Sequence, residues 1–197
     1  MISTQEMREV EDSCGIPKIT LMENAGKAVY EILNEKLGLK DKRVLIVAYH
    51  GNNGGDGFVA ARYIGDDAEV DILFMGDEER LKGETLANYR KIENDERIQI
   101  LDLEAVDFSD YDIIIDAIFG TGIKGEIKDP MATLIRNLGK AKAYKVSIDV
   151  PSGIDPDTGE KANVFLEPDL IITMHDIKNG LASYKDKTIV ADIGIKN

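Results

Sequence analysis

Seven short apolar runs recur along the chain, and segments with helical spacing lie between several of them. The runs span 43–49, 69–75, 97–101, 111–115, 143–148, 169–173 and 187–192. Several are continuously apolar, which is typical of strands buried on both faces of a sheet. The helical segments span 57–65, 78–94 and 131–139. This alternation predicts an α/β fold in which helices cover both faces of a mostly parallel sheet.

Two extra N-terminal helices are expected ahead of this alternation. Ser3 and Glu6 have the spacing of a capping box at a helix start, and Gly15 ends that helix. A second helix follows Pro17 and ends at Gly38. These helices either pack on the sheet or face a partner subunit.

The bulk composition limits the classes of function. The chain has 197 residues without repeats or linkers, so we expect one domain over 1–197. The net charge of −13 argues against nucleic acid as a partner. No apolar run approaches the roughly 20 residues of a membrane span, and the first residues do not look like a secretory signal. A single cysteine fits a reducing compartment, so the expected location is cytoplasmic.

Three conspicuous segments follow predicted strands. They are HGNNGGDG (50–57), DAIFGTGIKGE (116–126) and DVPSGIDPDTG (149–159). Because ligands bind beyond the carboxyl ends of strands in an open parallel sheet, we expect all three at one edge. Backbone amides of the first segment, at a helix N-terminus, could hold a phosphate. The segment matches neither a P-loop nor the usual dinucleotide fingerprint, and its glycines could merely let the helix pack closely.

Candidate chemistry gathers in these segments. Asn53, Asp116 and Ser152 offer hard oxygen ligands for a cation, whereas no Cys/His cluster indicates zinc. Asp116 and Asp149 could equally cap nearby turns. Lys124 is either a solvated loop lysine or a cation that faces the ligand. No Ser-His-Asp or Cys-His arrangement is visible, which argues against covalent acyl transfer.

Four segments in this order resemble the NAD(P)H-hydrate epimerase family (the YjeF N-terminal domain). They are GIPKITLMENAG (15–26), GNNGGDGFVAAR (51–62), DAIFGTGIKG (116–125) and DVPSGIDPDTG (149–159). The resemblance covers essentially the whole chain. It implies a Rossmann-like three-layer αβα sandwich, a homodimer, and a bound K+ ion in each subunit.

The resemblance also implies an activity. The family interconverts the R and S forms of hydrated NADH and NADPH (NADHX and NADPHX) at C6 of the nicotinamide ring. The S form then feeds a dehydratase, which we expect to be a separate protein. One alternative is a non-catalytic dimeric scaffold of the same fold that binds a nucleotide or a partner. Another is an enzyme that acts on a different nucleotide, such as ADP-ribose.

Site residues follow from the resemblance position by position. It implies substrate contacts at Asn52, Asn53, Gly54, Gly55, Asp56, Gly120, Thr121, Gly122, Ile123, Lys124, Gly125, Glu126 and Asp149. It implies potassium ligands at Asn53, Asp116 and Ser152. C6 carries a hydroxyl beside the ring nitrogen, so the reaction needs a proton donor and acceptor. We expect Asp149 to be this acid/base and Lys124 to donate to the leaving oxygen or to hold the ligand.

Two stretches depart from the family pattern. Ala48-Tyr49-His50 replaces a small Cys-Gly-Pro-type lead into the first segment. Near the C-terminus, TMHDIKNGL (173–181) replaces a Thr-Phe-x-x-x-Lys-like segment. Lys178 matches the family lysine there, but the sequence assigns it no role.

Overall fold

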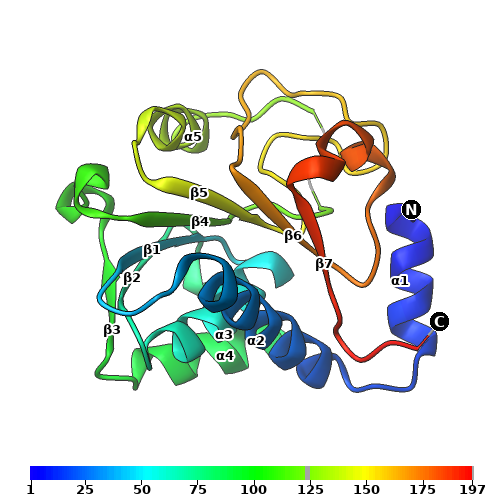
Figure 1. Ribbon diagram of the computed structural model, residues 1–197, viewed down its shortest axis with the longest axis horizontal. Coiled ribbons are helices and arrows are strands. Elements are labelled where there is room, and N and C mark those ends of the chain that lie inside the picture. Colours follow the sequence, from blue (N-terminus) through cyan, green and yellow to red (C-terminus); the bar gives the residue numbers. More distant parts are fainter. Residues whose placement is uncertain (123–124, 197) are drawn as a thin grey trace.

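A seven-stranded sheet forms the centre of the computed structural model, which describes residues 1–122 and 125–196 (Figure 1). The strands are β1 (Arg43–Ala48), β2 (Glu69–Phe74), β3 (Ile98–Leu101), β4 (Ile113–Ala117), β5 (Tyr144–Ile148), β6 (Leu170–Met174) and β7 (Thr188–Ala191). Their order is β3-β2-β1-β4-β5-β6-β7, and every neighbouring pair in it is parallel. The predicted α/β fold is therefore confirmed.

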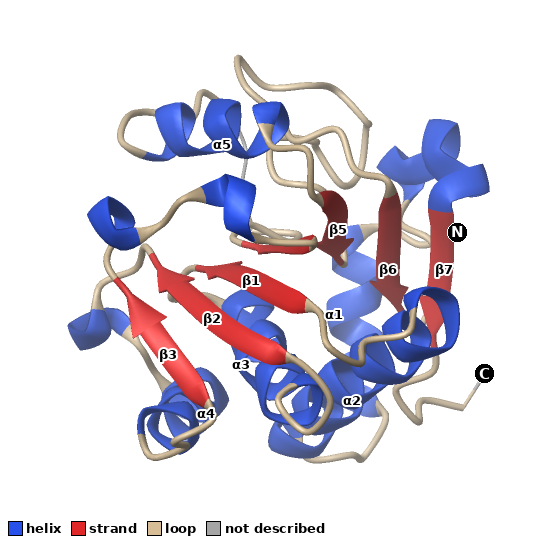
Figure 2. Ribbon diagram, turned by 60° about the vertical axis from the view of Figure 1, so that its left-hand side comes forward, coloured by secondary structure: helices blue, strands red, loops and turns tan. Residues whose placement is uncertain are grey.

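Helices form the two outer layers. Helices α2 (Lys18–Leu37), α3 (Asn52–Ile64) and α4 (Gly83–Glu93) cover one face, and α5 (Met131–Lys140) covers the other (Figure 2). Alternate residues of β1 face the two layers: Ile46 belongs to the core with α2 and α3, and Leu45 to the core with α5. Burial on both faces explains why the strands read as continuous apolar runs.

Short 3₁₀ helices complete the chain between these elements. They are η1 (Glu78–Arg80), η2 (Leu103–Ala105), η3 (Phe108–Asp110) and η4 (Asn179–Lys187). Within the described ranges, no helix has both the length and the apolar character needed to cross a membrane.

The two extra N-terminal helices take different places. Helix α1 (Thr4–Ser13) starts at the predicted capping box, in which the Ser3 amide donates to Glu6 at 2.8 Å. It lies beside the ends of β6 and β7 (Figure 1), and its buried Met7 belongs to the same apolar core as α2. Ile2 forms a parallel bridge with Lys178, and the Thr4 amide donates to Asp157 at 2.7 Å. Helix α2 instead packs against α3.

Three predicted element boundaries differ from those in the structure. The helix expected over 57–65 already begins at Asn52, so the glycine-rich segment is its first turn and not a loop. The helix expected over 78–94 is divided into η1 and α4. The strand expected over 111–115 is β4, displaced to Ile113–Ala117, so Asp116 lies inside it.

Close packing explains why glycines occupy the first turns of α3. A Cβ at Gly54 would lie 1.9 Å from the carbonyl oxygen of Tyr49. At Gly55 it would lie 2.6 Å from the Met22 sulfur, and at Gly57 it would lie 2.7 Å from the Cβ of Ala117. The interpretation that glycines let the helix approach the sheet therefore holds for Gly54 and Gly57, whereas Gly55 lets α3 pack closely against α2 and α4.

Candidate active site

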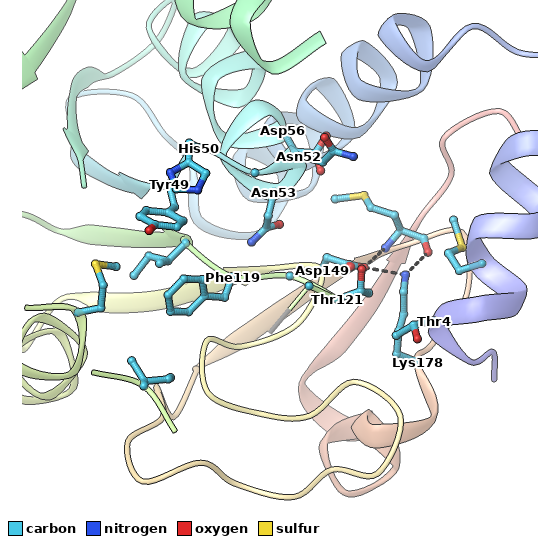
Figure 3. Close-up of a pocket in the computed structure, with 18 of the residues that line it drawn as sticks. Thr4, Tyr49, His50, Asn52, Asn53, Asp56, Phe119, Thr121, Asp149 and Lys178 are labelled. Atoms are coloured by element: carbon cyan, nitrogen blue, oxygen red, sulfur yellow. Dashed lines mark hydrogen bonds and ion pairs between the residues drawn. The ribbon is translucent and has the colours of Figure 1, made fainter. Parts of the chain in front are cut away.

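A cavity of about 780 Å³ opens at the carboxyl edge of the sheet (Figure 3). Its lining comes from the residues at the ends of β1, β4, β5 and β6, among them Tyr49, Ile118, Asp149 and Met174. Helix α1 adds a further wall that includes Glu11. The three predicted segments thus meet at one edge, as parallel strands require.

The predicted site residues fall into three groups. Those that line the cavity are Asn52, Asn53, Asp56, Gly120, Thr121, Gly122, Glu126 and Asp149. Asp116 and Ser152 are wholly buried, and the described lining does not include Gly54, Gly55 or Gly125. Ile123 and Lys124, which we expected to contact the substrate, lie outside the described residues.

Asp149 forms an ion pair with a buried lysine at the base of the cavity. Its Oδ1 lies 2.6 Å from Nζ of Lys178, whose side chain is only 1% exposed. The same oxygen accepts from the Thr173 hydroxyl at 3.1 Å and from the Met174 amide at 3.4 Å. Nζ of Lys178 also donates to the Met174 carbonyl at 2.8 Å. Together these contacts hold the Asp149 carboxylate in one orientation.

The backbone at Asp149 is unusual. Its φ is +64°, in the left-handed region that non-glycine residues seldom adopt. Such a conformation costs on the order of 1–3 kcal/mol and persists only where the surroundings enforce it. Here the Asp149 amide donates to the Ile172 carbonyl at 2.8 Å, so the neighbouring strand β6 helps to hold the turn. The turn directs the carboxylate toward Lys178.

Two further carboxyl groups face the same end of the cavity. Burial raises the pKa of Asp56, on α3, well above its usual range, and the charges of Asp149 and Glu11 raise it further. Burial also raises the pKa of Glu11, on α1, with a smaller contribution from Asp149. Three acids therefore share one buried ammonium group, that of Lys178.

A buried polar cluster lies beneath this cavity. The Asp116 carboxylate accepts from the Ser152 hydroxyl at 2.6 Å, the Ser152 amide at 2.8 Å and the Ser147 hydroxyl at 3.1 Å. Ser152 Oγ in turn accepts from the Phe119 amide at 3.1 Å. Burial raises the pKa of Asp116, and the hydrogen bonds from Ser152 oppose that shift. The cluster ties the β4 and β5 segments together.

Asn53 adds an unpaired group next to these residues. Asn53 is 7% exposed, yet among the described residues neither its Oδ1 nor its Nδ2 has a hydrogen-bond partner. A Cβ on Gly120 would lie 3.3 Å from its Cγ, so the side chain lies against the β4 segment. Buried polar atoms are seldom left without a partner, so Oδ1 of Asn53 is free to ligate a cation.

The donor chemistry fits an alkali cation. Asn53, Asp116 and Ser152 supply oxygens, which suit hard cations. Within the described part of the chain, His, Cys, Asp and Glu side chains form no group of three that could hold a metal. The residues present are therefore compatible with potassium and do not resemble a zinc site.

Aromatic side chains form the other end of the cavity (Figure 3). The rings of Tyr49 and His50 lie 3.9 Å apart between centroids, and Phe119 packs edge-on to Tyr49 at 5.5 Å. Burial lowers the pKa of His50, and the charge of Arg80 lowers it further. A neutral aromatic surface of this kind can stack against a planar ring.

Comparisons with known proteins identify the family of this chain. Residues 18–180 match the family model described as YjeF-related protein N-terminus. The chain belongs to this family. An NAD(P)H-hydrate epimerase of Nitrosopumilus maritimus is 40% identical to this member, over 95% of this chain and 90% of that protein.

Two further relatives of this YjeF-family chain differ in length and similarity. A bifunctional NAD(P)H-hydrate repair enzyme Nnr of Methanothermobacter thermautotrophicus is 35% identical over 92% of this chain, which spans only 37% of that protein. The crystal structure of the yeast protein ynu0 (YNL200c) superposes with a TM-score of 0.83 at 24% identity, covering 96% of this chain and 86% of that chain. The second similarity supports the fold alone.

Two features of this YjeF-family site were not predicted from the sequence. Lys178 was recognised as the family lysine but was not placed against Asp149. Glu11 was not singled out, although Met7 and Glu11 are four residues apart and so share one face of α1. The sequence therefore showed that Glu11 shares a face of α1 with an apolar residue. It did not show that this face lines the cavity, because that depends on where the chain places α1.

Proposed function

We propose that this chain is an NAD(P)H-hydrate epimerase, which interconverts the R and S forms of NADHX and NADPHX at C6 of the nicotinamide ring. The observation that carries the proposal is the Asp149–Lys178 pair at the base of the cavity. It supplies an oriented proton-transfer group in a chain 40% identical to a protein named NAD(P)H-hydrate epimerase.

The substrate explains why an oriented carboxylate is needed. C6 is a carbinolamine centre, so the nitrogen lone pair can expel the hydroxyl once that oxygen is protonated. Water can then return to either face of the planar iminium, or the ring can open and close instead. Positioned acid/base groups typically contribute 10²–10⁴-fold to such steps. Asp149 is the proposed acid/base, and Lys124 is proposed to donate to the leaving oxygen or to hold the ligand.

The remainder of the cavity suits a dinucleotide. Among the residues that the structure describes, no side chain caps the N-terminus of α3 at Gly51, so its first amides are available to a diphosphate. Backbone amides attract an anion without basic side chains, which matters in a protein with a net charge of −13. The aromatic surface of Tyr49, His50 and Phe119 would stack against a base of the substrate.

A potassium ion would complete the site, with Asn53, Asp116 and Ser152 as its proposed ligands. When bound, it would supply positive charge beside the buried Asp116 carboxylate. The unpaired Oδ1 of Asn53 supports this assignment.

The proposed biological setting follows from the reaction. We propose that the single domain 1–197 acts in the cytoplasm as a homodimer. The S form that it produces would be consumed by an NAD(P)H-hydrate dehydratase, with which this chain cooperates.

The test uses purified R-NADHX and R-NADPHX and chromatography that resolves the epimers, in potassium and in sodium. Spontaneous epimerisation sets the baseline. We expect faster approach to the R/S equilibrium, abolished in Asp149→Asn. Asparagine tolerates a positive φ, so this variant removes the charge without new backbone strain. No acceleration by folded protein in potassium would refute the epimerase assignment, and a normal rate in Asp149→Asn would refute the role of Asp149.

A further inference from the structure

Two aspartates face the cavity in opposite surroundings. Asp149 has an ammonium group at 2.6 Å, a hydroxyl at 3.1 Å and an amide at 3.4 Å. Asp56 lines the same cavity from α3, yet among the described residues its carboxyl group has neither a hydrogen bond nor an ion pair. Such contrasting environments separate two carboxyl groups into an ionised one and a protonated one.

The charges around Asp56 favour its neutral form. From β5 it faces Asp149, and from α1 it faces Glu11, both of which disfavour a further negative charge. Lys178, after β6, is the cation that opposes them, but its Nζ is already engaged by Asp149 and by the Met174 carbonyl. These contributions agree with burial, which raises the pKa of Asp56 most strongly. Asp56 therefore retains its proton to higher pH than an exposed aspartate does, and that proton faces the cavity.

We propose that Asp56 is a second catalytic residue, which protonates the hydroxyl at C6 while Asp149 accepts the proton of the returning water. This inference rests on the proposed epimerase function and deepens it. An epimerisation that passes through a planar centre uses one group to release the hydroxyl and another to activate water. A carboxylic acid on α3 and a carboxylate at the end of β5 meet that need.

The reaction has two steps, loss of the hydroxyl and return of water. The C6–O bond breaks, its electron pair leaves with oxygen, and the Asp56 proton converts that oxygen to water. The nitrogen lone pair forms the C6=N bond of the iminium. Water then attacks the opposite face of C6, the π electrons return to nitrogen, and a water proton passes to Asp149. Proton exchange with solvent restores Asp56 as acid and Asp149 as carboxylate, and the steps run backwards for the reverse reaction.

The test compares Asp56→Asn with Glu96→Gln, an exposed carboxyl away from the cavity. Asparagine keeps the shape of the side chain but cannot supply an acidic proton. We expect kcat of Asp56→Asn to fall by about 100-fold or more. KM should stay within about threefold of that of the unaltered protein. The thermal shift produced by NADP+ should stay within about a degree or two of its value in the unaltered protein. Glu96→Gln should match the unaltered protein in all three.

The pH profile gives an independent readout in the unaltered protein. Its kcat should fall at alkaline pH as Asp56 loses its proton, because the acid form is the active one. The residual activity of Asp56→Asn should lack this fall. A kcat of Asp56→Asn within threefold of the unaltered protein would overturn the proposal. So would a flat alkaline profile of the unaltered protein, or a parallel loss of NADP+ binding, which would make Asp56 a binding residue only.

The same experiment distinguishes failure of the epimerase assignment from failure of the role of Asp56. If the unaltered protein does not epimerise R-NADHX or R-NADPHX, the proposed function fails and the role of Asp56 fails with it. If the unaltered protein epimerises and Asp56→Asn does so equally well, the epimerase assignment stands and only the role of Asp56 is overturned.

Discussion

Lys178 forms an ion pair with Asp149, and its backbone also bridges to the N-terminal segment of the chain. Its Nζ lies 2.6 Å from the Asp149 carboxylate, while its backbone forms a parallel bridge with Ile2. One residue thus links the proposed acid/base, the end of β6 and the segment that leads into α1. Its side chain is only 1% exposed, so the ion pair lies at the base of the cavity and not on the protein surface.

Replacing Lys178 by methionine should therefore impair both stability and activity. Breaking a fully buried pair by removing one partner costs about 3–5 kcal/mol, and the cost here should be smaller because the Asp149 side chain is 14% exposed and lines the cavity. The Asp149 carboxylate also loses its orientation, so epimerisation should fall by roughly 100-fold. Urea unfolding and the epimer assay measure the two effects. The control is Lys140→Met, which replaces an exposed lysine of α5. Equal unfolding midpoints and equal epimerisation rates in the two variants would contradict a role for Lys178.

The buried cluster around Asp116 gives a test of the cation. Asp116→Ala leaves the Ser152 and Ser147 hydroxyls and the Ser152 amide without their acceptor. Each buried group left unpaired costs about 1–3 kcal/mol, so unfolding should occur at clearly lower urea. If potassium binds here, the unaltered protein should be more stable in KCl than in NaCl, and Asp116→Ala should show no such difference. A difference that survives the substitution would place the ion elsewhere.

The glycines of α3 offer a matched pair of substitutions. Gly54→Ala would put a methyl group 1.9 Å from the Tyr49 carbonyl oxygen, which is backbone and cannot turn aside. We expect a loss of about 3 kcal/mol or more, since overpacking typically costs about 1–3 kcal/mol even where side chains can adjust. Gly139→Ala in α5 meets nothing within 4 Å and should stabilise by about 0.5–1 kcal/mol. Equal melting temperatures for these two variants would refute the packing account.

Asp56 should also leave a signature in the pH dependence of stability. Its pKa in the folded protein is raised above the ordinary value of 3.8, so the folded state binds the proton more tightly than the unfolded chain does. Its contribution to stability is complete below pH 3.8 and is lost progressively as pH rises toward the raised pKa. Asp56→Asn should therefore gain stability over the unaltered protein at pH 8 relative to pH 4. A constant difference across that range, measured by urea unfolding, would contradict a raised pKa.

The sequence predicted the parts of the site that local chemistry determines. Continuous apolar runs identified the strands, and the segments after β1, β4 and β5 were placed at one edge because parallel strands end together. Asn53, Asp116 and Ser152 were proposed as cation ligands because their side chains carry oxygens, and that assignment stays a prediction. The structure brings them near one another as expected, since Phe119 and Gly120 contact Ser152 and Asn53 respectively.

What escaped prediction depends on contacts between distant residues. The Asn-Asn-Gly-Gly-Asp stretch reads as a loop because glycine disfavours helix by about 1 kcal/mol, yet close packing on Tyr49 and Met22 outweighs that preference. The pairing of Lys178 with Asp149 joins residues at the ends of two different strands. The place of α1 beside the cavity follows from the bridge between Ile2 and Lys178. Neither periodicity nor spacing carries that information.

The cavity draws its walls from both early and late parts of the chain, from Thr4 and Glu11 on α1 to Met174 at the end of β6 and Lys178 beyond it. During synthesis on the ribosome, a nascent chain therefore cannot assemble this pocket until Lys178 has left the exit tunnel. The glycine-rich start of α3 emerges long before Asp149 and the lysine that pairs with it. A ligand that needs both walls of the cavity can therefore bind only after Lys178 has emerged.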